Sequence, residues 1–91
     1  MRRERSGRVY SIRIIPRAQR DLDDITGKLF DQISEAILAL GDEPRPRGAV
    51  KLTGLEGYRI RVRDMRILYR IDDQAKEVIV YRIRHRREVY R

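Results

Sequence analysis

The chain of 91 residues has no cysteine, a single histidine and no long apolar run. Without cysteine it has no disulfide framework, thiolate zinc site or cysteine nucleophile. The longest apolar run, Ala36 to Leu40, is far shorter than the roughly 20 residues of a membrane-spanning helix, and the basic start is not followed by the apolar region of a secretory signal. We therefore expect a cytoplasmic protein with no membrane partner.

What the sequence has in excess is positive charge. It holds 22 Lys and Arg against 14 Asp and Glu, a formal net charge of +8. A surface this basic favours an anionic partner, because counterion release from a phosphate backbone supplies affinity for any sequence. Arginine-rich composition also follows from codon bias in a genome, so charge alone does not decide. The length predicts one domain over residues 8–91, preceded by a disordered basic extension over residues 1–7.

The first half of the chain predicts one strand and two helices. Alternating apolar residues indicate a strand from Arg8 to Pro16, closed by the proline. Apolar residues at spacings of four and three over residues 17–26 predict a short helix that ends at Gly27. A second apolar stripe predicts a helix from Lys28 to Leu40, capped by Gly41.

The second half alternates with a period of two, which is typical of strands buried on one side. Such segments cover Tyr58–Val62, Met65–Ile71 and Glu77–Ile83, separated by turns near Arg63–Asp64 and Asp72–Lys76. The elements predict an α+β fold in the order strand, helix, helix and three strands. The helical hairpin packs on one face of a mainly antiparallel four-stranded sheet, and the other face is left for arginines.

Arginines follow the same alternation. Arg59, Arg61 and Arg63 share one face, and the partner strand of the hairpin adds Arg66 and Arg70 beside them. Like charges directly opposite cost roughly 0.2 to 1 kcal/mol each in an antiparallel pair, so the cluster suggests a bound anion. A guanidinium stays charged and grips a phosphate through two parallel hydrogen bonds. The alternative is a solvated sheet face from which the arginines extend into water.

Short motifs spread over most of the chain carry a family resemblance. They are Tyr10-Ser-Ile-Arg13, Ala18…Leu22, Leu40…Pro44, Leu52-Thr-Gly-Leu55, Tyr58-Arg-Ile-Arg-Val62, Arg66-Ile-Leu-Tyr-Arg-Ile71 and His85-Arg-Arg-Glu-Val-Tyr90. In this order and at these separations they resemble the RelE/ParE superfamily of toxins from type II toxin–antitoxin pairs. The resemblance implies a RelE-like fold and a toxin that an antitoxin encoded beside it silences.

Two activities are known on this fold, and the resemblance implies the RelE-like one. RelE-like toxins cut messenger RNA in the ribosomal A site, whereas ParE-like toxins inhibit DNA gyrase and lack the cleavage residues. We expect an endoribonuclease without metal or other cofactor, with the antitoxin, messenger RNA and ribosomal RNA as partners. A ribose 2′-hydroxyl would attack the adjacent phosphodiester, leaving a 2′,3′-cyclic phosphate and a 5′-hydroxyl. Gyrase inhibition is the alternative, and a basic RNA-binding module without catalysis is a third interpretation.

The resemblance also implies the residues of the cleavage site. Arg61 and Arg66 would stabilise the charged transition state, which one well-placed donor does by about 3 kcal/mol. Arg59 would face the attacking hydroxyl. Arg86 would lie near the leaving 5′-oxygen, and Tyr90 would stack on or bond to the displaced base. The residues expected to bind RNA or the ribosome are Lys51, Arg63, Arg84 and Arg87.

Three positions depart from the family pattern. Several members carry lysine where this chain has Arg59, and a desolvated lysine can act as a base, whereas arginine with its pKa above ~12 cannot. Arg63 stands where glycine is usual, at a turn position that demands positive φ and costs a residue with a side chain on the order of 1 kcal/mol. Met65 stands where an aromatic residue is usual. Either the turn is remodelled or Arg63 is strained.

The remaining aromatic residues predict a structural role. Tyr58, Tyr69 and Tyr81 fall on the apolar sides of their strands, so we expect them in the core. His85, the one histidine, has an ordinary pKa near neutrality, but the resemblance gives it no catalytic role.

Overall fold

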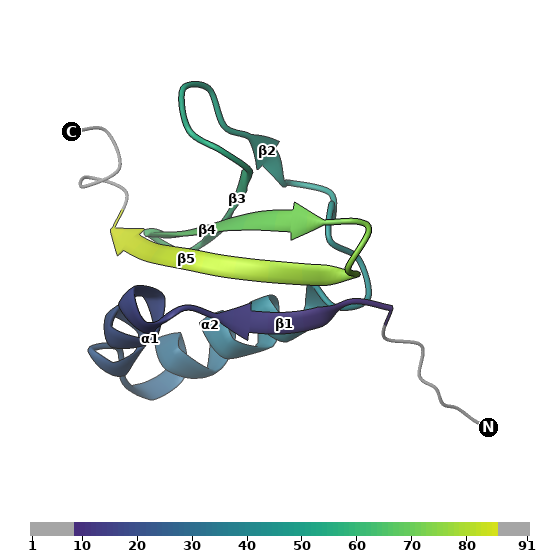
Figure 1. Cartoon of the computed structure of the whole chain (residues 1–91). Coiled ribbons are helices and arrows are strands. Elements are labelled where there is room, and N and C mark those ends of the chain that lie inside the picture. The colour runs from purple at the N-terminus through teal and green to yellow at the C-terminus, as the bar shows by residue number, and fades with distance from the viewer. Residues whose placement is uncertain (1–8, 86–91) are drawn as a thin grey trace.

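A computed structural model describes residues 9–85. The expected extension over residues 1–7 and the site residues Arg86, Arg87 and Tyr90 lie outside this range. The elements are β1 (Ser11–Ile14), α1 (Pro16–Asp23), α2 (Gly27–Ala39), β2 (Val50–Lys51), β3 (Tyr58–Val62), β4 (Met65–Asp72) and β5 (Glu77–His85) (Figure 1). Among the described residues, no helix is long and apolar enough to cross a membrane.

The strands form one sheet in the order β1-β5-β4-β3-β2. β1 pairs with β5 in parallel, and the other neighbours are antiparallel. Both helices lie on one face of this sheet. In Figure 1 they lie below the sheet, and the opposite face points upward. The predicted α+β class and element order are confirmed. The short edge strand β2 makes the sheet five-stranded instead of four-stranded.

The core lies between the helices and the sheet. Its buried residues come from both helices and from β3, β4 and β5: Ala18, Leu22, Ile33, Ile37, Leu40, Ile60, Ile67, Tyr69, Val78, Val80 and Ile83. The period of two in β3 and the first part of β4 places Ile60 and Ile67 directly opposite each other, both facing the helices. Tyr58 packs against this cluster and Tyr69 belongs to it, as predicted.

Tyr81 is not in the core, and this prediction was wrong. Leu68 pairs with Arg82 and Tyr69 with Val80, so Tyr81 is an extra residue in a bulge of β5. A bulge of one residue reverses the alternation of side chains beyond it. Val80 and Ile83 therefore both face the helices, while the Tyr81 hydroxyl donates to the carbonyl oxygen of Glu56 at 2.8 Å, away from the core.

Of the two glycines expected to end helices, Gly27 begins one instead, whereas Gly41 directly follows the C-cap residue Leu40. α1 ends at Asp23, and Gly27, which has a positive φ of 68°, is the first residue of α2. α2 ends at Ala39. The carbonyl oxygen of Gly41 accepts hydrogen bonds from the amides of Val9 and Tyr10, so Gly41 ties the helix exit to the start of β1.

The turn between β3 and β4 keeps the positive φ that the sequence predicts. Val62 pairs with Met65 across it, and Arg63 has a φ of 55°. An arginine therefore occupies a backbone conformation that favours glycine. The turn is not remodelled, and the strain stays at the end of the arginine-rich strand.

Candidate functional site

Three arginines form one row across the centre of the sheet. Arg61 in β3 lies opposite Arg66 in β4, and Arg66 lies opposite Arg84 in β5. Directly paired residues share a face and have Cβ atoms about 5 Å apart. This row faces away from the helices, because Ile60, Ile67 and Ile83 beside it face the core. The geometry concentrates positive charge along one line.

The members of the row differ in exposure. Arg61 is exposed, Arg84 is half-buried, and Arg66 has only 2% of its surface exposed. A buried cation acts through a medium that screens it less than water does. Arg66 is therefore the member of the row whose charge water screens least.

A groove of about 390 Å³ continues from the row along the edge of β3. β2 pairs only with Tyr58 and Arg59, so the rest of β3 borders open space beside the loop that precedes β2. The residues lining the groove are Arg47, Gly48, Val50, Arg59, Ile60 and Arg61. Arg61 thus belongs both to the row and to the groove.

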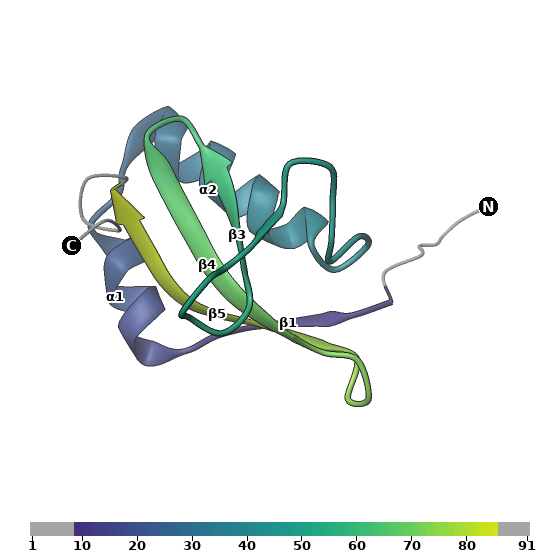
Figure 2. The ribbon, with the colours of Figure 1, turned by 90° about the horizontal axis from the view of Figure 1, so that it is seen from above.

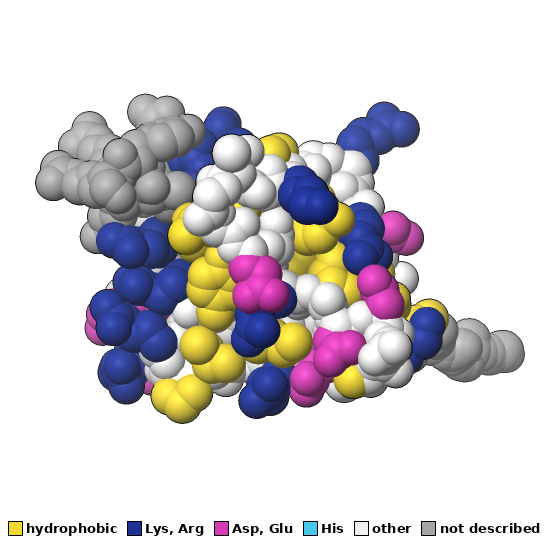
Figure 3. All heavy atoms as spheres, turned by 45° about the horizontal axis from the view of Figure 1, so that its top comes forward, with side chains coloured by type: hydrophobic (Ala, Val, Ile, Leu, Met, Phe, Trp, Pro, Cys, Tyr) yellow, Lys and Arg dark blue, Asp and Glu magenta, His cyan; other side chains and the backbone are white. Residues whose placement is uncertain are grey.

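Three arginines of this surface form no ion pair with a described carboxylate. Within residues 9–85, no carboxylate lies within the 4.0 Å of an ion pair from Arg59, Arg61 or Arg63. Figure 3 shows basic side chains at several places around a middle of hydrophobic and some acidic side chains, on the side that includes this face. An anion that enters the groove would meet guanidinium groups with no competing carboxylate on the described chain.

Most of the described site residues come together, and one does not. Arg59, Arg61, Arg66 and Arg84 lie on the face opposite the helices, and Arg63 follows at the end of β3. Lys51 pairs with Tyr58, which packs against the core, so Lys51 points to the other side of the sheet from Arg59. Arg86, Arg87 and Tyr90 fall outside the described residues.

The same face changes character toward its other end. Leu68 and Ile79 are buried there, although neither belongs to the helix-side core. The loop between β2 and β3 crosses this region, as Figure 2 shows, and Glu56 in the loop accepts from Tyr81 and lies 3.9 Å from Arg70. The face predicted to hold only arginines is therefore half cationic and half covered and apolar.

Gly57 lets this loop lie close to the sheet. It has a φ of 97°, and a Cβ atom there would collide with the carbonyl oxygen of Tyr69. The amide of Leu52 donates to the carbonyl oxygen of Gly57 at 2.9 Å and closes the loop. β3 can begin at Tyr58 only because residue 57 lacks a side chain.

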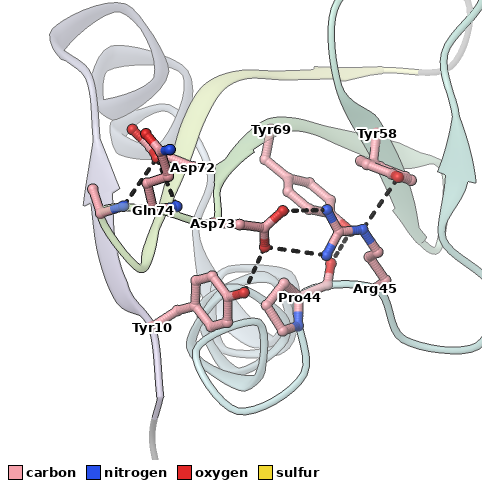
Figure 4. Close-up of polar contacts among 9 residues, drawn as sticks. Tyr10, Pro44, Arg45, Tyr58, Tyr69, Asp72, Asp73 and Gln74 are labelled. Atoms are coloured by element: carbon pink, nitrogen blue, oxygen red, sulfur yellow. Dashed lines mark hydrogen bonds and ion pairs between the residues drawn. The ribbon is translucent and has the colours of Figure 1, made fainter.

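A second arginine site holds the preceding loop in place (Figure 4). Arg45 forms an ion pair with Asp73 at 2.9 Å and donates through Nε to the Tyr58 hydroxyl at 3.2 Å. The Tyr10 hydroxyl donates to Asp73 at 2.6 Å, and the buried Tyr69 hydroxyl donates to the carbonyl oxygen of Pro44 at 2.7 Å. We call these contacts the Arg45–Asp73 clamp.

Several members of the clamp have shifted pKa values, among them Asp73 and Tyr69. The hydrogen bonds from Arg45 and then from Tyr10 hold the pKa of the Asp73 carboxyl below its ordinary value. Burial raises the pKa of Tyr69 to about 12. Asp73 is thus charged and Tyr69 neutral over the physiological range, which is the state that both sets of hydrogen bonds require.

Sequence reasoning underrated two residues of the site. The last strand was predicted to end at Ile83, with Arg84 beyond it and expected only to bind RNA or the ribosome, but β5 continues to His85 and its register brings Arg84 beside Arg66. The sequence leaves open whether Arg47, in the loop ahead of the strands, reaches ribosomal RNA phosphates or is only solvated, and in the structure it lines the groove with Arg59. Continued alternation beyond Ile83 was the available signal for Arg84. No local signal decided between the two roles for Arg47.

An apolar groove of about 300 Å³ lies on the helix side of the molecule. The residues lining it are Ile12, Ile14, Leu22, Ser34, Ile37 and Leu38. Leu38 has 48% of its surface exposed, and Phe30 on the same helix has 37%. An exposed apolar patch by the helical hairpin is a surface suited to a protein partner.

Comparisons with known proteins agree on one family. The family model for the ParE toxin of type II toxin–antitoxin systems matches residues 12–90. Toxin RelG of Mycobacterium tuberculosis is 34% identical over 86 residues, which cover 90% of this chain and 97% of that protein.

Solved structures share the fold. The RelBE2 toxin–antitoxin complex of Mycobacterium tuberculosis contains a chain with a TM-score of 0.77 and 28% identity, covering 91% of this chain and 98% of that one. A chain of the RelE–RelB complex of Pyrococcus horikoshii has a TM-score of 0.75 and 24% identity, covering 86% and 96%. The protein is therefore a type II toxin–antitoxin toxin of the RelE/ParE superfamily.

Proposed function

We propose that this toxin is a RelE-like endoribonuclease that cuts messenger RNA on the ribosome and so inhibits translation. The observation that carries the proposal is the row of Arg61, Arg66 and Arg84. The row continues into a groove, and none of the residues that line the groove is acidic. Such a surface suits a phosphodiester, because a guanidinium binds phosphate oxygens through paired, charge-assisted hydrogen bonds.

The proposed reaction needs charge stabilisation at a phosphorus atom. The ribose 2′-oxygen forms a bond to phosphorus as the bond to the 5′-oxygen breaks; the 2′-hydroxyl loses its proton and the leaving 5′-oxygen gains one. The products are a 2′,3′-cyclic phosphate and a 5′-hydroxyl. The transition state carries more negative charge than the substrate, so donors aimed at its oxygens lower the barrier selectively.

The proposal gives each site residue a role. Arg61 and Arg66 stabilise the transition state, and the register adds Arg84 to them. Arg59 in the groove orients the ribose and its flanking phosphate. Arg59 is not the base, because a guanidinium keeps its proton. Arg86 and Tyr90 are proposed from the resemblance to act on the leaving oxygen and the displaced base.

The antitoxin is the proposed protein partner. The toxins of the Mycobacterium tuberculosis and Pyrococcus horikoshii structures are in complex with their antitoxins. The apolar groove beside Leu38 is the surface that we propose for a cognate antitoxin here. Replacing Leu38 by aspartate should prevent copurification with the antitoxin, whereas replacing the equally exposed Val50, on the far face, by aspartate should leave the complex intact.

Gyrase inhibition is the second candidate, because the matching family model describes the ParE toxin. Primer extension on messenger RNA after brief induction separates the two. Codon-phased cuts that vanish in the Arg86→Ala, Tyr90→Ala double variant support the nuclease. Intact message together with accumulating gyrase-linked DNA breaks would support the ParE-like activity and overturn the proposal of a nuclease.

A further inference from the structure

We propose that Arg47 is a third cation of the groove and binds a backbone phosphate next to the one that is cleaved. The inference rests on the proposed function, because it takes single-stranded RNA as the ligand. Arg47 lines the groove with Arg59 and Arg61, although it comes from the loop before β2 and they come from β3. Two separate segments thus present guanidinium groups to one hollow.

The backbone at Arg47 is held in a defined turn. The amide of Ala49 donates to the carbonyl oxygen of Pro46 at 3.0 Å, so residues 46–49 close a β-turn. Gly48 has a φ of 97°, as the third position of a type II turn requires. Pro46 fixes its own φ just before Arg47. Arg47 therefore projects from the second position of a rigid turn.

The Arg45–Asp73 clamp holds this turn against the sheet. Arg45 is bound by Asp73 and Tyr58, and the carbonyl oxygen of Pro44 accepts from Tyr69. These contacts lie two and three residues before Arg47. A ligand that binds Arg47 has to order one side chain and not a loop, which lowers the entropy lost on binding.

The Arg47 side chain is exposed and available to a ligand. It makes no ion pair with a carboxylate of residues 9–85, in contrast to Arg45 two residues earlier. A structural role for both arginines would have given both a partner. The groove instead joins Arg47 to Arg61, and Arg61 begins the row at which cleavage is proposed.

RNA fits this arrangement through its chemistry. A strand whose reacting phosphate lies at the row leaves through the groove, so the next phosphate passes between Arg59 and Arg47. The contact is to phosphate oxygens and reads no base, so it adds affinity for any sequence and depends on salt. An acidic segment of a protein is the competing ligand, and the experiment separates the two.

The test is the salt dependence of RNA binding, measured by fluorescence anisotropy with a short labelled single-stranded RNA. One phosphate contact on a single strand contributes about 0.7 to the slope of log affinity against log salt concentration. Arg47→Ala should lower the slope by about 0.7 and weaken binding about three- to tenfold at low salt. Arg47→Lys should keep the slope and lose only part of the affinity.

Arg17→Ala is the matched control, because it removes the same charge from an exposed position of α1, which packs beside β5 at the opposite side of the sheet. Equal slopes for Arg47→Ala and Arg17→Ala, with a lower slope for Arg61→Ala, would overturn the role of Arg47 alone. Loss of antitoxin binding in Arg47→Ala with unchanged RNA binding would also overturn it. A wild-type toxin that neither binds RNA nor cuts message on ribosomes would remove the proposed function itself.

Discussion

Arg45 of the clamp and the arginines of β3 occupy opposite electrostatic settings. Arg45 is matched by Asp73 at 2.9 Å and by the Tyr58 hydroxyl, and these contacts join the loop before β2 to the rest of the fold. Arg59 and Arg61 form no ion pair with a carboxylate of residues 9–85. Arg45 completes the structure, and the arginines of β3 leave charge available to a ligand.

The difference shows why net charge alone does not locate a binding site. Both regions contain the same residue type on the same basic chain. An exposed ion pair contributes little stability, about 0 to 1 kcal/mol, but it also cancels the charge that a phosphate would need. Like charges placed side by side in a sheet cost a similar amount. The grouping of Arg59 and Arg61 is the feature on which we base the proposed phosphate site.

The largest effect is expected at Gly57, which directly precedes Tyr58 of the clamp and Arg59 of the groove. Gly57→Ala forces a side chain into the carbonyl oxygen of Tyr69 at a φ of 97°, and should lower the free energy of unfolding by about 3 kcal/mol. Chemical denaturation measures the loss. Gly54→Ala is the control, because Gly54 also has positive φ, 80°, but open space around it. Equal losses for both variants would contradict the close approach.

The next test of the clamp removes the buried hydroxyl of Tyr69. Tyr69→Phe removes the donor to the carbonyl oxygen of Pro44 and should cost about 1 to 2 kcal/mol in the free energy of unfolding. Because the pKa of Tyr69 is raised to about 12, the wild-type protein should also lose stability as pH rises from about 10 toward 12. Tyr69→Phe should lack this tyrosine's contribution to the alkaline loss, which pH-dependent denaturation measures. An undiminished alkaline loss in the variant would assign the loss to other groups.

A carboxylate introduced beside β3 should pair with Arg59, as Asp73 pairs with Arg45. Val50 lies opposite Arg59 and is 43% exposed, so Val50→Glu creates a cross-strand partner for that arginine. RNA affinity should fall about tenfold at low salt, while the melting temperature stays the same or rises slightly. Val50→Gln has the same shape without the charge and should bind as the wild type does. A similar loss in both variants would point to shape and not charge.

The smallest effect concerns the pH dependence of the clamp itself. The pKa of Asp73 is held below its ordinary value in the folded state, so its stabilising contribution is present above that value and is lost as pH falls below about 4. Asp73→Asn should therefore be less stable than the wild type near neutral pH, and the difference should shrink in acid. Thermal melts over a pH series measure it. A difference that stays constant down to acid pH would show that the carboxylate charge is not involved.

Much of the fold could be predicted because it follows from local periodicity. The limits of β3 were predicted to the residue, and α2 to within one residue at each end, since each presents a clear apolar face. The bulge at Tyr81 could not be predicted, because one extra residue in a strand leaves no signature in the alternation of a single sequence. It moved Tyr81 from the predicted core to the opposite face.

The site was predictable only in part, for a related reason. Arg59 and Arg61 share a strand, so the period of two placed them together. Arg45 and Asp73 are 28 residues apart, and Arg47 meets Arg59 across two segments. Such pairs depend on how elements pack, which a single sequence does not reveal. Strand pairing also explains why Lys51 lies outside the site. Lys51 pairs with Tyr58 and therefore lies on the helix side of the sheet.

The most direct test of the central claim is the single-turnover rate of message cleavage on programmed ribosomes, compared between Arg61→Ala and Arg45→Ala. If Arg61 stabilises charge on the reacting phosphate and Arg45 only holds a loop, Arg61→Ala should lower the rate by about 100- to 1,000-fold without loss of melting temperature. Arg45→Ala should stay within about tenfold of the wild type, through its effect on the Arg47 turn. A wild-type rate in Arg61→Ala, or an equal collapse in both variants, would contradict the account.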